Sequence, residues 1–349
     1  MINVLVTGIG GGGVGEQLIK ALRLSAYNYT IIGTDITNIS KGFKEVDFAY
    51  VVPKATQPNY IETILEISRK HNIKVIFSGY EAELQLLADN ADVFRKEGIH
   101  LFVNPKDVLN ICLDKTKTIH FLAKNNFYFP KSHAISKIED IANIDYFPNV
   151  LKPSIGGGGS MNVMIAQNKG ELELFASFLL KIYPQFIVQE YVGTPEHEYT
   201  VGVLFDKDSN YINAIALKRQ ISSGLSCRLR VPNYSSNQSL GNSLVISSGI
   251  SQGEFGHFPA VTAQCSEIAK TLKANYSINL QCRLVDDKVY IFEINPRFSG
   301  TTSLRAMVGY NEPDVLIRKE VLGEKITPNF PYNYAHIVRG LKEEVFFTT

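Results

Sequence analysis

The segment 288–300, KVYIFEINPRFSG, places three polar residues at every second position: Glu293, Asn295 and Arg297. Side chains two apart on a strand share one face, so a strand here would bring a carboxylate, an amide oxygen and a guanidinium together. Carboxylate and amide oxygens are hard ligands that Mg²⁺ accepts, and arginine binds phosphate oxygens through two nitrogens. This spacing therefore indicates a site for a metal-bound polyphosphate.

Glu293 needs a second ligand from the neighbouring strand, and Gln281 is the candidate. A hairpin loop of residues 286–287 alone would set Gln281 opposite Phe292, on the wrong face of the sheet. A three-residue loop, 286–288, would set Gln281 opposite Glu293, and so would a bulge. We therefore predict an odd-length loop or a bulge in this hairpin.

A glycine cluster near the N-terminus reads GIGGGGVG over residues 8–15 and satisfies the pattern GxGxxG in two registers. Asp35 follows about 20 residues later, where a dinucleotide fold carries its ribose-binding acid. The loop is therefore a candidate phosphate or NAD(P) site at a helix N-terminus. The alternative is a tight turn that lets the helix pack on the sheet.

A second glycine cluster follows Lys152 and separates two predicted strands, so it is not a Walker loop, which precedes a helix. Such a loop, with exposed backbone N–H groups, could close over phosphates while Lys152 supplies a point charge. The alternative is a flexible hairpin. The residues of the loop are Gly156, Gly157, Gly158, Gly159 and Ser160.

The order of elements predicts a mixed fold. Strands and helices alternate over residues 2–103, which predicts a doubly wound parallel sheet, with a single helix over 81–97. After residue 130, short strands with one helix over 169–182 predict an α+β lobe on an antiparallel sheet. The expected fold class is thus α/β plus α+β.

Composition excludes several classes of function. The chain has 349 residues, 45% of them hydrophobic and 20% charged, with a formal net charge of +1, so we expect no nucleic acid or membrane surface as partner. Its four cysteines form no CxxC pair, which indicates reduced thiols. Neither a signal peptide nor a membrane span is indicated, so we expect a cytoplasmic protein.

The motifs, taken in order, resemble the ATP-grasp superfamily of ligases. The branch that the chain resembles is the carbamoyl-phosphate-synthase type, in which N-x-Q precedes E-x-N-P-R and a G-Y-N-x-P segment follows. The resemblance covers nearly the whole chain. The matching segments are 114–115 (DK), 151–160 (LKPSIGGGGS), 189–192 (QEYV), 198–201 (EYTV), 279–281 (NLQ), 293–297 (EINPR), 299–305 and 309–313 (GYNEP).

The resemblance implies three parts: a pre-ATP-grasp domain over 1–105, linker helices and a small ATP-binding lobe over 106–205, and a C-terminal lobe with the metal site over 206–349. It implies ATP and Mg²⁺ as cofactors, with Mn²⁺ as an alternative metal. For the nucleotide, it implies phosphate contacts from Lys115 and Lys152, a flap at 156–160, an adenine hinge at Gln189, Glu190, Tyr191 and Val192, and a ribose contact at Glu198.

The resemblance also implies a reaction. A small-molecule carboxylate attacks the γ-phosphate, and an amine then displaces phosphate from the acyl phosphate. Gln281, Glu293 and Asn295 would ligate the metal, while Arg297, Lys218 and Arg219 would face the reacting groups. For the substrates we expect contacts from Gly11, Gly12 and Glu81, and from Arg228 and Arg230, which share a face if they lie on a strand. Relatives of this type are commonly homodimers.

Three alternatives remain. An enzyme of the carboxylating or carbamoyl-phosphate type would use bicarbonate, but carbamoyl phosphate synthesis requires a duplicated ATP-grasp half, and this chain has one copy. An NAD-dependent oxidoreductase would explain the first glycine loop but not Lys152 or the EINPR strand. A non-catalytic nucleotide-binding module would not need the full set of lysines and metal ligands.

Overall fold

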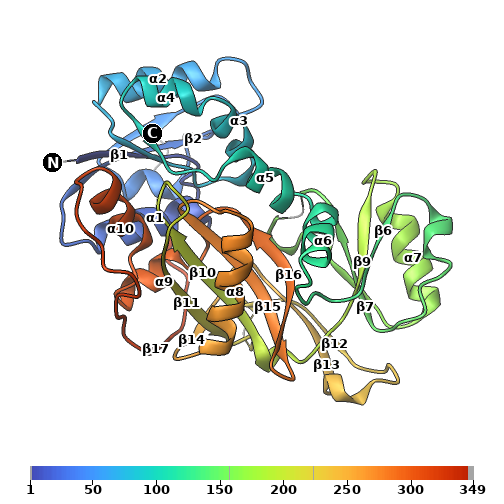
Figure 1. Cartoon of the computed structure of the whole chain (residues 1–349). Helices are drawn as coiled ribbons and strands as arrows, with labels where there is room; N and C mark the ends of the chain where they lie inside the picture. Colours follow the sequence, from blue (N-terminus) through green and yellow to red (C-terminus); the bar gives the residue numbers. More distant parts are fainter. Residues whose placement is uncertain (1, 157, 223, 345–349) are drawn as a thin grey trace.

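The computed structural model describes residues 2–156, 158–222 and 224–344. An N-terminal parallel sheet and a large antiparallel sheet lie against each other, and a small lobe projects from the large one (Figure 1). The predicted fold class, α/β plus α+β, is confirmed. The domain limits drawn from the sequence remain a prediction.

The N-terminal sheet is parallel, with the strand order β3-β2-β1-β4-β5. Its central strands are buried on both faces, as expected when helices cover both sides of a parallel sheet. The elements are β1 Ile2–Val6, α1 Val14–Arg23, β2 Tyr29–Asp35, β3 Phe48–Val51, α2 Tyr60–Lys70, β4 Val75–Phe77, α3 Leu84–Asp89, α4 Ala91–Lys96 and β5 His100–Leu101.

The predicted helix over 81–97 is interrupted. A 3₁₀ turn at Glu81–Glu83 precedes α3, and α3 and α4 meet at Asn90. The Asn90 side chain donates a hydrogen bond to the Leu86 carbonyl, a local bond that competes with a continuous helix. The prediction that residues 81–97 are helical is confirmed for most of the segment, which is divided into three short helical pieces.

Two short helices lead into the small lobe, α5 Lys106–Cys112 and α6 Lys115–Lys124. Asp114 caps α6, since its side chain accepts hydrogen bonds from the backbone of Thr116 and Lys117. The cap fixes the start of α6 and so places Lys115 as its first residue.

The small lobe is an antiparallel sheet with the strand order β6-β9-β7-β8, and its core is shared with α7 Lys169–Leu179. The glycine loop connects β7 to β8, so the prediction of a loop between two strands is confirmed. The strands are β6 Ser132–Ile135, β7 Asn149–Pro153, β8 Met164–Ala166 and β9 Phe186–Glu190.

The large sheet has the order β16-β15-β10-β11-β14-β17, with α8 Pro259–Thr271 packed on it. Strand β10 pairs within this sheet, although the predicted domain limits place its residues in the middle segment, 106–205. A two-stranded sheet of β12 Cys227–Pro232 and β13 Ser243–Ser247 lies beside it. The six strands are β10 Glu198–Phe205, β11 Tyr211–Arg219, β14 Gly253–Phe255, β15 Ser277–Val285, β16 Lys288–Asn295 and β17 Ala335–Ile337.

One hydrophobic core joins the N-terminal domain to the large lobe. Helices α9 Thr302–Met307 and α10 Glu312–Glu320 pack against α1, and the rings of Phe77 and Phe298 meet at a centroid distance of 5.3 Å. Because this core is continuous, the first glycine loop is held at a fixed place relative to the end of β16.

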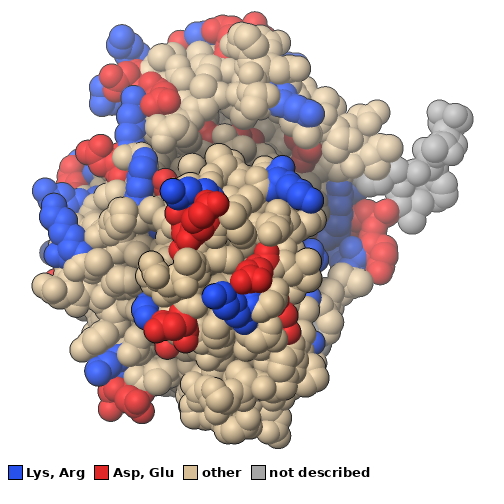
Figure 2. Space-filling view, turned by 90° about the vertical axis from the view of Figure 1, so that its right-hand side faces the viewer, with Lys and Arg blue, Asp and Glu red and all other residues tan. Residues whose placement is uncertain are grey.

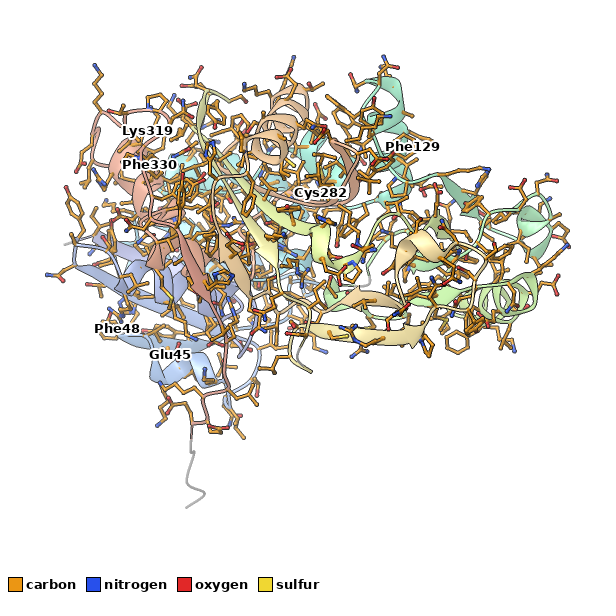
Figure 3. All side chains as sticks on the ribbon, turned by 90° about the horizontal axis from the view of Figure 1, so that it is seen from below. Glu45, Phe48, Phe129, Cys282, Lys319 and Phe330 are labelled. Atoms are coloured by element: carbon orange, nitrogen blue, oxygen red, sulfur yellow. The ribbon has the colours of Figure 1, made fainter. Side chains whose placement is uncertain are left out.

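On the face shown in Figure 2, positive and negative side chains are interspersed. The four cysteines are free, and Cys282 lies inside the large lobe (Figure 3). Among the helices of the described residues, none is both long and apolar enough to span a membrane.

Candidate active site

A cavity, here called the slot, opens between the small lobe and the large sheet. Its walls are largely apolar, with Val150, Val163 and Phe292 among them. Charged and polar groups stand around these walls, including Lys115 and Lys152. An apolar cleft with a few converging polar groups is the usual form of a small-molecule site.

The hairpin of β15 and β16 brings the predicted metal ligands together. Val285 pairs with Lys288, so the loop is Asp286-Asp287, and both aspartates have positive φ, as a tight type I′ turn requires. The prediction of a three-residue loop was wrong. The alternative, a bulge, is confirmed, because the register shifts at Phe292 and sets Gln281 opposite Glu293.

The bulge has a second effect, on Lys152. With Phe292 left out of the ladder, its carbonyl accepts a hydrogen bond from Lys152 Nζ at 2.8 Å, and Gln189 Oε1 accepts another at 2.8 Å. Burial lowers the pKa of Lys152 to about 7, despite the opposing effect of Glu293. A phosphate bound beside Lys152 would raise this pKa, and the lysine would then take up a proton from solvent.

A second cavity, here called the central cavity, has a volume of about 420 Å³. It lies where the first glycine loop, the flap and the end of β16 meet, and it includes Gly12, Gly159 and Asn295. Gln281 and Glu293 line both cavities. The predicted metal ligands thus stand where the slot joins the central cavity.

Arg297 connects the two domains at this junction. Its Nη2 lies 3.3 Å from Glu81 Oε2 and donates to Asn295 Oδ1 at 3.2 Å. Glu81 comes from the turn after β4, so the N-terminal domain supplies the counter-charge for a guanidinium of the large lobe. The predicted proximity of Glu81 to the catalytic cleft agrees with this contact.

The donor set fits magnesium bound with a nucleotide. Gln281 Nε2 donates to Glu293 Oε2 at 3.0 Å, and Asn295 lies two residues further along the same strand. No group of three His, Cys, Asp or Glu residues within the described ranges could hold a metal ion. Because Mg²⁺ in phosphate sites uses one or two carboxylates and completes its shell with phosphates and water, a single carboxylate with two amides is a suitable protein share.

Comparisons with known proteins agree with this geometry. Residues 4–102 match the family described as "PylC-like, N-terminal domain", and residues 246–342 match "ATP-grasp in the biosynthetic pathway with Ter operon". The chain belongs to the ATP-grasp superfamily. The second match includes the segment that carries Glu293, Asn295 and Arg297.

A curated relative supports the branch inferred from the motifs. The arginine-specific large chain of mitochondrial carbamoyl phosphate synthase from Schizosaccharomyces pombe is 27% identical over 214 residues. The aligned part is 57% of this ATP-grasp chain but only 18% of that protein. The chain therefore spans a minor part of the length of this relative.

Solved structures show the same fold. The L-amino acid ligase from Bacillus licheniformis matches with a TM-score of 0.65 at 15% identity, covering 94% of this chain and 78% of that one. The biotin carboxylase domain of Hydrogenobacter thermophilus 2-oxoglutarate carboxylase, in complex with MgADP, ADP and bicarbonate, matches with a TM-score of 0.63 at 18% identity, covering 94% and 71%.

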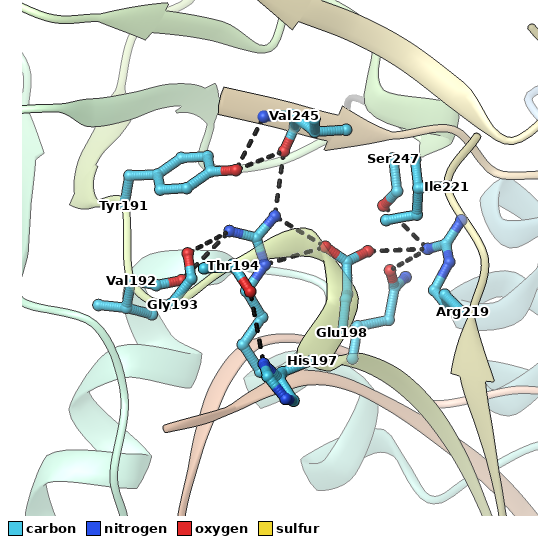
Figure 4. Close-up of polar contacts among 12 residues, drawn as sticks. Tyr191, Val192, Gly193, Thr194, His197, Glu198, Arg219, Ile221, Val245 and Ser247 are labelled. Atoms are coloured by element: carbon cyan, nitrogen blue, oxygen red, sulfur yellow. Dashed lines mark hydrogen bonds and ion pairs between the residues drawn. The ribbon is translucent and has the colours of Figure 1, made fainter. Parts of the chain in front are cut away.

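The sequence reading missed the environment of Glu198 in this ATP-grasp site (Figure 4). Its carboxylate lies between two buried guanidiniums, 3.0 Å from Arg283 and 3.3 Å from Arg219. Oε1 of Glu198 is buried yet accepts no hydrogen bond of good geometry. This atom has the ion pair with Arg219 but lacks a well-aligned donor, and a ligand hydroxyl would supply one.

Arg283 also fixes the hinge. It donates to the carbonyls of Val192 and Gly193, each at 3.2 Å, and lies 4.4 Å from the ring centroid of Tyr191. No described residue accepts a hydrogen bond from the Val192 amide, which stays available to a ligand. The feature of the sequence that could have revealed Arg283 is its position two residues after Gln281 on the same strand.

The flap is described except for Gly157, which lies outside the described residues. Gly156 and Gly159 have positive φ, a conformation that favours glycine. Lys115 Nζ donates to the Gly156 carbonyl at 3.3 Å, and Ser160 Oγ donates to the Ser247 carbonyl at 2.8 Å. The flap thus lies over the slot, in contact with α6 on one side and with β13 on the other.

Two of the predicted residues lie elsewhere. Lys218 and Arg230 line a separate surface groove with Glu254 and His336, and neither reaches the slot or the central cavity. Lys218 precedes Arg219 on β11, so their side chains point to opposite faces. Arg219 and Arg228 do line the central cavity, whereas Arg230 donates to the Ile221 carbonyl.

The first glycine loop forms a tight turn. A Cβ atom on Gly15 would lie 2.4 Å from the Gly8 carbonyl oxygen, so α1 starts too close to the strand end for any side chain there. Asp35 accepts hydrogen bonds from its own loop, from the Ile36 amide and the Ser40 hydroxyl. Gly12 lines the central cavity, but Gly11 does not.

Proposed function

We propose that this chain is an ADP-forming ligase that activates a small-molecule carboxylate with ATP and joins it to an amine. The observation that carries the proposal is the register of β15 and β16, which sets Gln281 beside Glu293 at the junction of the two cavities. The formation of an acyl phosphate requires the nucleotide and the carboxylate to meet beside the bound metal. The junction of the two cavities offers such a place.

The slot would bind the nucleotide. The Val192 amide would donate to the adenine ring and Glu198 would accept from the ribose, with Arg283 holding both in place through its contacts with each. Lys115 and Lys152 would contact the phosphates. Mg²⁺ held by Gln281, Glu293 and Asn295 would neutralise charge on the phosphates.

The central cavity would bind the carboxylate. Its oxygen attacks the γ-phosphorus, the bond from that phosphorus to the bridging oxygen breaks, and ADP leaves. An amine then adds to the acyl carbon, and inorganic phosphate departs with the bonding electrons and accepts the proton that the amine nitrogen loses. Arg297 would stabilise the negative charge on the transferred phosphoryl group. The flap would exclude water from the acyl phosphate.

The comparisons support this proposal through the names of similar proteins, which include an L-amino acid ligase. They also keep a second candidate open, a bicarbonate-using enzyme, since a carboxylase domain with bicarbonate and a carbamoyl phosphate synthase chain are similar as well. Homodimer formation remains a prediction.

The test is ADP release from MgATP with a panel of carboxylates and hydroxylamine, which converts an acyl phosphate into a hydroxamate. We expect metal-dependent ADP and hydroxamate in equal amounts with at least one carboxylate. ADP formation driven by bicarbonate alone would favour the second candidate. Binding of NADH without binding of MgATP would overturn both.

A further inference from the structure

Arg228 stands apart from the other cations of the central cavity. Arg219 is paired with Glu198 at 3.3 Å, and Arg297 is paired with Glu81 at 3.3 Å. Arg228 also lines the cavity but has no hydrogen bond or ion pair with any residue in the described ranges. Its positive charge is therefore available to a ligand.

The charge of the cavity wall is unbalanced. Three arginines line it, whereas Glu293 is its one carboxylate among the described residues. Glu293 also belongs to the proposed metal site, so it cannot serve as the partner of Arg228. Because Glu198 and Glu81 neutralise Arg219 and Arg297, Arg228 is the arginine of this wall that is left to attract an anionic ligand.

The rest of the wall is made of small polar residues. Apart from glycines, the described lining contains only two apolar side chains, Val14 and Ile250. Hydroxyl and amide groups are the commonest of its side chains, and several are already paired within the wall, as Thr200 is with Asn279 and Ser299 with Thr301. The residues that supply these groups are Thr200, Ser248, Ser251, Asn279, Ser299 and Thr301.

Resting on the proposed function, we infer that the carboxylate substrate carries a second anionic group and that Arg228 binds it. The reacting carboxylate lies beside Asn295 and Arg297, at the end of β16. The second anionic group lies at β12, which is a different strand from β16. Carboxylate and phosphate share the chemistry that a guanidinium recognises, so either can supply this second group.

The experiment measures binding by calorimetry to the full chain loaded with Mg²⁺ and a non-hydrolysable ATP analogue. Succinate is compared with butyrate and glutarate with valerate, because each pair differs by one carboxylate replaced by methyl. 3-Phosphoglycerate is compared with glycerate as the phosphate arm. We expect the dianion of at least one pair to bind about tenfold tighter or more.

Arg228→Gln should remove this preference, and Arg228→Lys should retain part of it. Arg230→Gln is the matched control, because it removes the same charge from the same strand but outside the cavity. The control should keep the full preference. Arg228 is exposed and makes no contact of its own, so its variants should fold normally.

Each of the remaining outcomes overturns either the proposed function or the inference about Arg228. Failure of the ATP analogue to bind would overturn the proposed function itself. Normal binding of the analogue, with dianions no tighter than monoanions in any pair, would overturn only the inference. A weaker analogue in Arg228→Gln, with the dianion preference intact, would assign Arg228 to the triphosphate and overturn the inference as well.

Discussion

The slot and the central cavity share Gln281 and Glu293, yet they are built in different ways. In the slot the charges are buried and paired: Glu198 lies between two arginines, and Lys152 donates to two acceptors. In the central cavity most side chains are small or polar, and one arginine has no ion-pair partner within the described ranges.

The difference reflects what each cavity has to recognise. A buried, paired network has one low-energy arrangement, so it suits a ligand of constant shape such as a nucleotide. In an open cavity with an unpaired charge, a few side chains can be substituted without disturbing the core. Such a cavity is therefore suited to determine which substrate binds.

Glu293→Gln should affect both cavities, because Glu293 is the one carboxylate in the described residues that lines both. The amide keeps the size of the side chain but removes the charge that faces the metal. We expect ADP formation to fall by about 100-fold or more, measured under saturating MgATP. Glu254→Gln, in the separate groove, is the control. Unchanged turnover of Glu293→Gln would refute the metal assignment.

Glu198→Gln should affect the slot through stability. Both arginines would remain buried without a counter-charge, so the free energy of unfolding should fall by about 3–5 kcal/mol, measured by urea denaturation. Glu196→Gln is the matched control, since Glu196 is exposed on the same turn, and it should change stability by less than about 0.5 kcal/mol. Equal losses in the two variants would contradict a paired, buried network.

Lys152 should make nucleotide binding dependent on pH. Because burial lowers its pKa to about 7, it is mostly neutral at pH 8 and should take up most of a proton when phosphates bind. Calorimetry in buffers of different ionisation enthalpy measures this uptake, and Lys152→Met should abolish it.

The same shift has a consequence for folding. Between pH 7 and the ordinary lysine value of 10.5, the unfolded chain holds the Lys152 proton and the folded chain does not. The contribution of Lys152 to the free energy of unfolding should therefore rise with pH across this window. A wild-type profile that matches that of Lys152→Met would count against the lowered pKa.

Glu81→Gln should have the smallest effect on stability. Its ion pair with Arg297 is partly exposed, so we expect a loss of less than about 1 kcal/mol. If Glu81 helps to bind the amine, the KM for the amine should rise while the KM for ATP stays the same. An unchanged amine KM would leave Glu81 as the partner of Arg297 alone.

Local patterns were enough to predict much of the fold. The buried runs of β1 and β2, and the alternation of polar residues on β16, follow from backbone periodicity, which neighbours in sequence define. Strand β3 was not predicted, because it lies at the edge of its sheet and is mostly exposed, so it lacks a buried apolar run. The break at Asn90 depends on one side-chain bond that periodicity does not record.

The sequence by itself determined which groups the site contains: the carboxylate, amides, lysines and arginines, and their order along the chain. The tertiary structure decided which of them meet. The bulge at Phe292 set the partner of Glu293, β11 turned Lys218 away from Arg219, and β12 left Arg228 and Arg230 at different cavities. The first and last of these outcomes depend on register shifts between paired strands, which residue types alone do not specify, whereas the second follows from side-chain alternation once β11 has formed.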